Sequence, residues 1–147
     1  MRIAIASDHA AFDLKSELVT WLREEGHSVD DLGPYGTDSV DYPDYGYKLG
    51  ATIASGAAER GVALCGSGIG ISIAVNREAK ARCALVSEPL SAQLARQHND
   101  ANVIAMGARL IGVGMAKACI EVFLVTEFLG DRHASRVKKL GKPEEAK

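Results

Sequence analysis

The chain has 147 residues, of which 47% are hydrophobic and 24% are charged, a composition typical of a globular domain with a proper core. Its formal net charge of −2 argues against nonspecific nucleic-acid binding, which needs a broad basic surface. No apolar run approaches the roughly 20 residues of a membrane span, and the first residues lack the pattern of a signal peptide. We therefore expect a single domain over residues 1–147, with no nucleic-acid or membrane partner.

Short apolar runs alternate with segments of helical character along the chain. Five runs predict strands, at residues 2–6, 28–32, 62–64, 82–86 and 102–106. Apolar spacing or small-residue composition predicts the intervening helices, at residues 12–22, 45–58, from 69 onward, from 89 towards 97–100, and within 108–129. This alternation predicts an α/β fold, a Rossmann-like three-layer αβα sandwich with a five-stranded parallel sheet.

Two polar segments interrupt this pattern. Residues 34–44 contain two prolines and three aspartates, and a loop of this length in a compact domain often lines a binding site. Residues 131–147 form a tail that is basic and then mixed in charge. Arg132 and Arg136 would share one face of a helical turn and could clamp a phosphate, although a solvated basic tail would explain the same residues.

The chain is organised around the glycine loop that follows the third predicted strand. Val62–Leu64 delivers Cys65 to a loop with glycines at alternate positions, Gly66, Gly68 and Gly70. Strand, loop and helix start expose backbone N–H groups that stabilise an anion, a developing oxyanion or a thiolate. The loop lacks the lysine of a Walker A motif and is one residue short of the dinucleotide-binding spacing. A plain tight connection between strand and helix remains the alternative.

The three cysteines differ in their surroundings. Cys83 and Cys119 lie inside apolar periodic runs, as small core residues do, whereas Cys65 adjoins the glycine loop and could be a nucleophile, a base or a core residue. A phosphatase nucleophile would need an arginine six residues on, where Ile71 stands. A cysteine base beside N–H donors suits proton abstraction next to a carbonyl. An odd number of cysteines without zinc-binding spacing indicates reduced thiols in a cytoplasmic protein.

Polar residues near other strand ends could join this cysteine, because ligands of parallel α/β sheets bind at the carboxyl ends of the strands. Asp8 and His9 follow the first predicted strand, and Arg109 follows the fifth. We expect the polar segment 97–99, which contains His98, to reach the same edge. Asp8 could instead be only the N-cap of the following helix, and His98 a solvated residue at a helix end.

Several stretches together carry a family resemblance that none would carry alone: Ser7–His9 with Lys15, Val40–Pro43, Cys65–Ser72, Ser87–Pro89, Arg96–Asn102, and Gly130–His133 with Arg136 and Val137. By these stretches the sequence resembles the type B ribose-5-phosphate isomerases, in the family that also holds allose-6-phosphate and galactose-6-phosphate isomerases. The resemblance covers nearly the whole chain. One departure is Ser67, where many members have threonine; serine keeps the hydroxyl but loses the methyl group, which leaves the sugar preference open.

The resemblance implies a metal-independent aldose–ketose isomerase of the pentose phosphate pathway that works through an enediol without a cofactor. It implies that Cys65 moves the proton between C1 and C2, and that His98 opens the furanose ring with help from the Ser67 hydroxyl. Asp8 would contact the ring oxygen and hydroxyls. The implied substrate-binding residues are Asp8, His9, Tyr42, Gly66, Ser67, Gly68, Ile69, Gly70, Asn99, Arg109, Arg132 and Arg136.

Members of this family are dimers or tetramers whose active sites draw residues from two subunits. The resemblance therefore implies a homodimer or tetramer, with the tail 131–147 against a partner subunit. The expected reaction interconverts ribose 5-phosphate and ribulose 5-phosphate. The alternatives are an isomerase of a six-carbon sugar phosphate such as allose 6-phosphate, a noncatalytic sugar-phosphate-binding module, which would not need Cys65 or His98, and a redox sensor based on Cys65.

Overall fold

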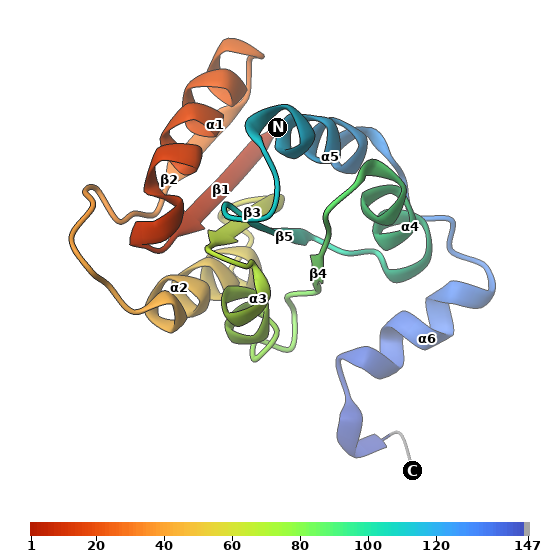
Figure 1. The fold of residues 1–147 in the computed structure, drawn as a ribbon. Coiled ribbons are helices and arrows are strands. Elements are labelled where there is room, and N and C mark those ends of the chain that lie inside the picture. Colours follow the sequence, from red (N-terminus) through yellow and green to blue (C-terminus); the bar gives the residue numbers. More distant parts are fainter. Residues whose placement is uncertain (146–147) are drawn as a thin grey trace.

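Strands and helices alternate along the chain in the computed structural model, which describes residues 1–145 (Figure 1). The strands are β1 (Arg2–Ser7), β2 (Ser28–Asp31), β3 (Arg60–Cys65), β4 (Cys83–Leu85) and β5 (Val103–Gly107). The α-helices are α1 (Phe12–Glu24), α2 (Tyr42–Ala54), α3 (Ile69–Val75), α4 (Pro89–Asn99), α5 (Val113–Val125) and α6 (Arg132–Leu140). Short 3-10 turns, η1 (His9–Ala11) and η2 (Pro143–Glu145), complete the described part.

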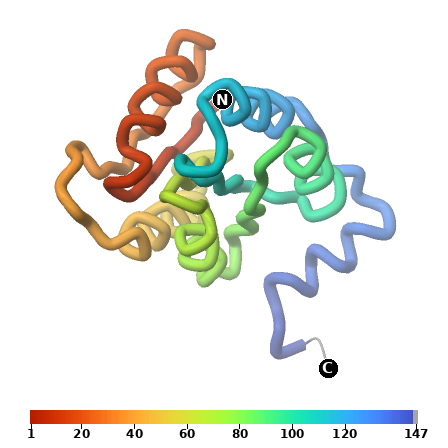
Figure 2. The backbone as a smooth tube through the Cα atoms, in the orientation of Figure 1, coloured from red at the N-terminus to blue at the C-terminus, as the bar shows by residue number. Residues whose placement is uncertain are grey.

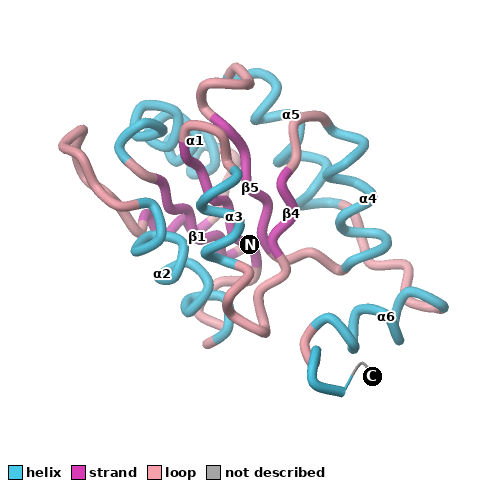
Figure 3. Tube along the Cα trace, turned by 60° about the horizontal axis from the view of Figure 1, so that its bottom comes forward, coloured by secondary structure: helices cyan, strands magenta, loops and turns pink. Residues whose placement is uncertain are grey.

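The five strands form one sheet in the order β2-β1-β3-β5-β4, and every neighbouring pair is parallel. Alternate strand residues point to opposite faces, so each face carries its own apolar core. One core, which includes Ile5, Leu64 and Ile104, packs against α1, α4 and α5, and the other, which includes Ala63 and Ala105, packs against α2 and α3. Figure 3 shows helices on both sides of the strands. The predicted three-layer fold is confirmed.

The direction of the chain reverses at the pair β1–β3. After β1 the chain passes to β2 at one edge, and after β3 it passes to β4 at the other edge. The loops that follow β1 and β3 therefore diverge and leave a crevice at the carboxyl ends of these two strands. The residues that follow them are Asp8 and Gly66, so the sheet order itself brings the two predicted catalytic loops together.

Two predicted boundaries are corrected. Tyr42–Asp44, expected in the polar loop, form the first turn of α2 because Pro43 lacks the backbone N–H that a first turn leaves unpaired. The basic tail contains the helix α6, which packs against α4 at the periphery of the molecule (Figure 2). Residues 146–147 of the predicted tail lie outside the described residues. Among the helices of residues 1–145, none has the length and apolarity that crossing a bilayer requires.

Candidate active site

A cavity of about 500 Å³ opens at the carboxyl ends of β1 and β3. It brings together nine of the predicted site residues: Asp8, His9, Tyr42, Cys65, Gly66, Ser67, Ile69, Gly70 and Arg109. Ala10 and Leu110 complete its lining. The sequence analysis missed these two because an alanine and a leucine carry no chemical signal, although each adjoins a predicted residue. Most of the predicted site is therefore one continuous surface within a single chain.

The Cys65 sulfur lies at the wall of this cavity and is engaged by the glycine loop. The backbone N–H of Gly68 donates to Cys65 Sγ at 3.1 Å, and the side chain is 5% exposed. Gly68 has a φ of 77°, and a Cβ there would lie 2.7 Å from the carbonyl carbon of Met106. Only glycine satisfies both conditions. The loop thus holds an N–H donor against the sulfur, where it would stabilise negative charge on a thiolate.

The same loop offers further donors to the cavity. The N–H groups of Gly66, Ser67 and Gly70 donate to no acceptor within residues 1–145, whereas the Ile69 N–H donates to Ser67 Oγ at 3.2 Å. Three backbone donors next to a sulfur make up the arrangement predicted for an oxyanion. Ser67 Oγ can still donate its own hydrogen, since it is the acceptor in its bond with the Ile69 N–H.

Tyr42 forms the wall opposite this loop. A Cβ on Gly70 would lie 2.5 Å from Tyr42 Cε1, so the tyrosine ring rests directly on the glycine. Tyr42 is the first residue of α2, and α2 packs against α3. The missing side chain at residue 70 is therefore what allows the aromatic ring to close one side of the cavity.

Asp8 and His9 occupy the turn after β1. Asp8 Oδ1 accepts from the Ala11 N–H at 3.2 Å, so this residue caps η1 as the alternative interpretation proposed and also lines the cavity. His9 Nδ1 accepts from the Val40 N–H at 3.1 Å. A neutral His9 therefore carries its proton on Nε2 and can donate it to a ligand. The predicted substrate role of Asp8 is compatible with its capping role.

A buried lysine fixes the loop that His9 contacts. Lys15 Nζ donates to Asp31 Oδ1 at 2.6 Å and to the Pro34 carbonyl at 2.9 Å, and its side chain is fully buried. Asp31 Oδ1 also accepts from the Gly33 N–H at 2.9 Å. A buried charge is tolerated only when it is paired in this way. The residues that precede α2 are thereby held beside the cavity at both ends, by Lys15 and by His9.

Arg109 brings a cation to the cavity from the end of β5. The backbone N–H of Arg109 donates to the Gly66 carbonyl at 2.9 Å, and a Cβ on Gly66 would lie 3.4 Å from Arg109 Nε. The guanidinium thus lies over the glycine loop and is exposed. An anionic ligand group in the cavity would meet this cation and the free N–H groups together.

Five predicted residues do not line this cavity. Gly68 stays beside it, since its N–H donates to Cys65 Sγ, and the other four lie elsewhere: His98, Asn99, Arg132 and Arg136. The helix α4 starts beyond the carboxyl end of β4 and returns to the amino end of β5, so its last residues lie at the opposite edge of the sheet from Cys65. The expectation that segment 97–99 reaches the same edge within one chain is wrong. Helix direction could have corrected it, because a helix between two parallel strands must run back across the sheet.

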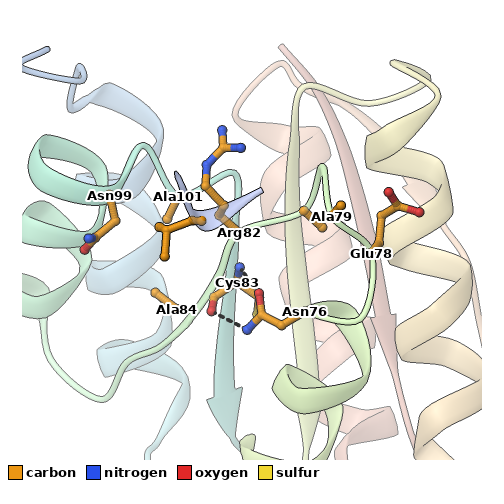
Figure 4. A pocket seen from close by; sticks show the side chains of 10 residues that line it. Asn76, Glu78, Ala79, Arg82, Cys83, Ala84, Asn99 and Ala101 are labelled. Atoms are coloured by element: carbon orange, nitrogen blue, oxygen red, sulfur yellow. Dashed lines mark hydrogen bonds between the residues drawn. The ribbon is translucent and has the colours of Figure 1, made fainter. Parts of the chain in front are cut away.

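These four residues form a second group where α4 meets α6. The rings of His98 and His133 are stacked, with centroids 4.4 Å apart and planes 13° apart. Arg132 and Arg136 are exposed on α6, one helical turn apart. Asn99 lines a separate cavity of about 390 Å³ with Arg82, Cys83 and other residues (Figure 4).

The rest of the stretch Arg96–Asn102 holds this group in place. Arg96 is 3% exposed; it donates to Asp100 Oδ1 at 2.8 Å, to the Ala101 carbonyl at 2.6 Å and to the Thr126 carbonyl at 3.0 Å. Asp100 adopts a positive φ of 44° and also pairs with Arg82 at 3.3 Å. The turn after α4 is therefore fixed by buried polar contacts, and His98 and Asn99 are presented from a rigid support.

Burial shifts the pKa of several groups outside the cavity. Burial lowers the pKa of His133, the neighbouring His98, Arg132 and Arg136 lower it further, and Asp131 opposes them. Burial also raises the pKa of Cys83 to about 12. The pKa of Cys119 is raised by burial and by Glu88. Neither of these thiols is an effective base near neutral pH, which agrees with their predicted place in the core.

The donor set differs from that of a metal centre. Within residues 1–145, no three His, Cys, Asp or Glu side chains are gathered closely enough to hold a metal ion. The cavity instead combines one sulfur with main-chain N–H groups, one carboxylate, one imidazole and one guanidinium. Such a set can bind an anion, stabilise an oxyanion and move a proton.

Comparison with known proteins identifies relatives over almost the whole chain. Residues 3–140 match the family described as Ribose/Galactose Isomerase. Ribose-5-phosphate isomerase B of Escherichia coli (strain K12) is 42% identical over 139 residues, which cover 95% of this chain and 93% of that protein. D-erythrulose-4-phosphate isomerase of Pectobacterium atrosepticum is 42% identical over 143 residues, 96% of this chain and 93% of that protein.

The fold comparison agrees with the sequence comparison. The solved structure of Clostridium thermocellum Ribose-5-Phosphate Isomerase B superposes with a TM-score of 0.96 at 43% identity, and the match covers 99% of this chain and 98% of that chain.

Proposed function

Because this chain belongs to the ribose/galactose isomerase family, we propose that it interconverts ribose 5-phosphate and ribulose 5-phosphate through an enediol intermediate. The observation that carries this proposal is the position of Cys65. Its sulfur lines the cavity, accepts the Gly68 N–H at 3.1 Å and lies beside the free N–H groups of Gly66, Ser67 and Gly70. A base next to oxyanion donors is what proton abstraction beside a carbonyl requires.

The proton transfer follows from this geometry. The Cys65 thiolate takes the C2 proton of the open-chain aldose, and the C–H electrons form the C1–C2 double bond while the carbonyl electrons move to O1. The N–H groups of the glycine loop stabilise the charge on the enediolate oxygen. The thiol then returns the proton to C1 while the C2 hydroxyl proton passes to O1, which leaves a hydroxyl at C1 and a ketone at C2. The loop thus stabilises the negative charge that develops on the substrate, and Cys65 transfers the proton from C2 to C1.

A second copy of the chain would supply the remaining predicted residues. Ring opening needs an acid at the ring oxygen, and His98 lies at the opposite edge of its own sheet from Cys65. We assign this step to His98 of the partner subunit, with Ser67 and Asp8 of the first copy at the sugar hydroxyls and ring oxygen, and with Asn99 of the partner subunit as a further contact. His9 and Arg109 would meet Arg132 and Arg136 of the partner subunit around the phosphate.

An exposed apolar strip at the β4 edge supports this homodimer. Ile69 and Ile73 of α3 are 50% and 51% exposed, Leu85 of β4 is 46% exposed, and Leu90 and Leu94 of α4 are 60% and 38% exposed. Large apolar side chains gathered beside an edge strand mark an interaction surface. Ile69 also lines the cavity, and Leu90 and Leu94 lie on the same helix as His98, so a second copy placed on this strip would bring its own α4 close to the cavity. The tail 131–147 would then lie against the partner subunit.

The first test is turnover. Purified enzyme in EDTA should convert ribose 5-phosphate, and we expect lower kcat/KM for allose 6-phosphate and for D-erythrulose 4-phosphate, the substrate class named for one relative. Loss of turnover in EDTA with recovery on adding a divalent ion would contradict the metal-independent mechanism. A clear preference for a six-carbon sugar would change the assigned substrate but not the proposed mechanism.

Three free thiols, Cys65, Cys83 and Cys119, suit a reducing compartment, and we propose that the enzyme acts in the cytoplasm.

The second test addresses the shared site. Cys65→Ala and His98→Asn are each expected to be nearly inactive alone. After unfolding and refolding of an equimolar mixture, about half of the dimers contain one chain of each kind, and each of these has one intact site of two, so about a quarter of wild-type activity should return. No recovery, with mixed dimers demonstrated by mass spectrometry, would mean that each site is built within one chain.

A further inference from the structure

His133 is the residue at the α4–α6 group to which the sequence analysis gave no role. It stands in the first turn of α6, is 6% exposed, and stacks on His98 from the last turn of α4 at a centroid distance of 4.4 Å. The two rings come from different helices and lie almost parallel, 13° apart. Parallel stacking at this distance is a specific contact, because aromatic rings pack in many other orientations.

The stack is what fixes the plane of the His98 ring. The χ2 torsion of histidine is broad, so a neighbouring group must set the direction in which its ring nitrogens point. Within residues 1–145, neither nitrogen of His98 forms a hydrogen bond, and the ring packs face to face on His133. The contact that holds the ring plane of His98 therefore comes from α6.

The surroundings of His133 keep it uncharged. Its Nε2 atom is buried and has no hydrogen-bond partner in the described part of the chain. A proton there would create a buried imidazolium beside Arg132 and Arg136, opposite His98, with only Asp131 to offset the repulsion. These groups lower the pKa of His133, as does its burial.

We propose that His133 is a positioning residue for His98: its ring holds the His98 imidazole in the plane from which it protonates the sugar ring oxygen. The inference rests on the proposed function only for the acid's role at the ring oxygen. The stack and its effect on His98 belong to one chain and can be observed without any substrate.

Two substitutions separate the stacking face from the imidazole nitrogens. His133→Phe keeps a flat ring against His98 and removes the titrating nitrogens, and His133→Leu keeps an apolar side chain and removes the flat ring. In NMR spectra of the His98 ring protons, we expect His133→Phe to retain the upfield ring-current shift of wild type and His133→Leu to lose it. Identical His98 spectra in wild type and His133→Leu would overturn the stack in solution.

Kinetics then separate ring opening from proton transfer. Ribulose 5-phosphate cannot close a furanose ring, because its O5 carries the phosphate, so deuterium exchange at its C1 in D2O reports the Cys65 step alone. We expect His133→Leu to lower kcat on ribose 5-phosphate by about tenfold or more, within the ~10² range that misplacement of a catalytic group costs. The C1 exchange rate should stay within about threefold, and His133→Phe should stay within about threefold in both assays.

The outcomes distinguish this inference from the proposed function. Equal losses in ring opening and C1 exchange, or equal losses in His133→Phe and His133→Leu, would make His133 a structural residue and overturn the positioning role. Failure of wild type to act on ribose 5-phosphate or to exchange the C1 hydrogen would refute the proposed function instead. The NMR result would still report whether His133 orients His98.

Discussion

The cavity at the end of the sheet and the group at the α4–α6 contact are built by different means. The cavity takes its shape from strand ends and main-chain atoms, with Cys65 on β3 and its donors in the following loop. The second group consists of side chains on two helices at the periphery, held by ring stacking and by the buried contacts of Arg96. The cavity at the sheet holds the groups for proton transfer, and the group on the two helices holds the proposed acid and two cations. Substitutions should therefore affect different steps in the two regions.

The largest expected effect is at Cys65. Cys65→Ala removes the proposed base, and we expect kcat and the C1 exchange rate to fall together by about 10³-fold, within the range of general base catalysis. Coupled assay and deuterium exchange measure the two rates. Cys119→Ala is the matched control, since it removes a fully buried thiol from α5, remote from the cavity. Near-wild-type turnover in Cys65→Ala would refute the assignment of the base.

His98→Asn should distinguish ring opening, assigned to the α4–α6 group, from proton transfer in the cavity. We expect kcat on ribose 5-phosphate to fall by about 10²-fold, because ring opening loses its acid, while C1 exchange of ribulose 5-phosphate falls far less. The comparison uses the same two assays on one preparation. Equal losses in both rates would remove His98 from ring opening and weaken the division between the two regions.

Gly68→Ala tests the backbone construction of the cavity. The substitution forces alanine into a φ of 77° and places its Cβ 2.7 Å from Met106 main chain, and we expect a loss of about 1–3 kcal/mol in the free energy of unfolding. Urea denaturation measures it. Gly114→Ala is the control, because this glycine lies in α5 with no atom near its absent Cβ, and alanine there should be neutral or stabilising by up to about 1 kcal/mol. Equal effects would mean that the loop is less constrained than its contacts indicate.

Arg136→Ala tests the cations of the second group. We expect KM for ribose 5-phosphate to rise about tenfold with little change in kcat, because charge-assisted bonds to phosphate strengthen binding in the ground and transition states alike. Steady-state kinetics measure both constants, and Lys138→Ala, on another face of the same helix, should leave them unchanged. An unaltered KM in Arg136→Ala would leave this part of α6 as a solvated basic surface.

The smallest expected effect is the pH dependence that His133 confers. Its pKa is lowered in the folded chain below the ordinary value of 6.5, so the unfolded chain binds more protons between the two values. Stability attributable to this residue is therefore present above about pH 6.5 and is lost as the pH falls towards the lowered pKa. Thermal unfolding from pH 7.5 to 5 should show a smaller decrease in Tm for His133→Phe than for wild type. Parallel curves would show that His133 does not titrate differently on folding.

Much of the fold and of the cavity was predictable because both depend on local pattern. Apolar runs gave the strands, and the position of Cys65 and Asp8 at strand ends followed from them. The rule that parallel sheets bind ligands at the carboxyl ends then placed both residues at one site. The start of α2 at Tyr42 was missed because a proline beside several aspartates is as common in loops as in a helix's first turn.

The arrangement of the α4–α6 group was harder to predict from the sequence. The likeness of the sequence to a known family singled out His98, Asn99, Arg132 and Arg136, but spacing along the chain does not give the direction in which α4 crosses the sheet. The stack of His98 on His133 joins residues 35 positions apart on two helices, and no periodicity encodes such a contact. The wrong placement of segment 97–99 has this cause, and its role remains a prediction.

The free N–H groups of the glycine loop have a consequence for how new sugar specificities arise. A main-chain donor is not removed by a change of side chain elsewhere in the cavity, so the proton-transfer chemistry tolerates substitutions outside the glycines that shape the loop. Ser67, Tyr42 and Leu110 contribute side chains to the same cavity, where a change of size or polarity would alter the fit of the sugar and leave these main-chain donors in place. A mutant library confined to these three codons should therefore yield enzymes with altered carbon-chain preference that all retain the capacity for proton transfer.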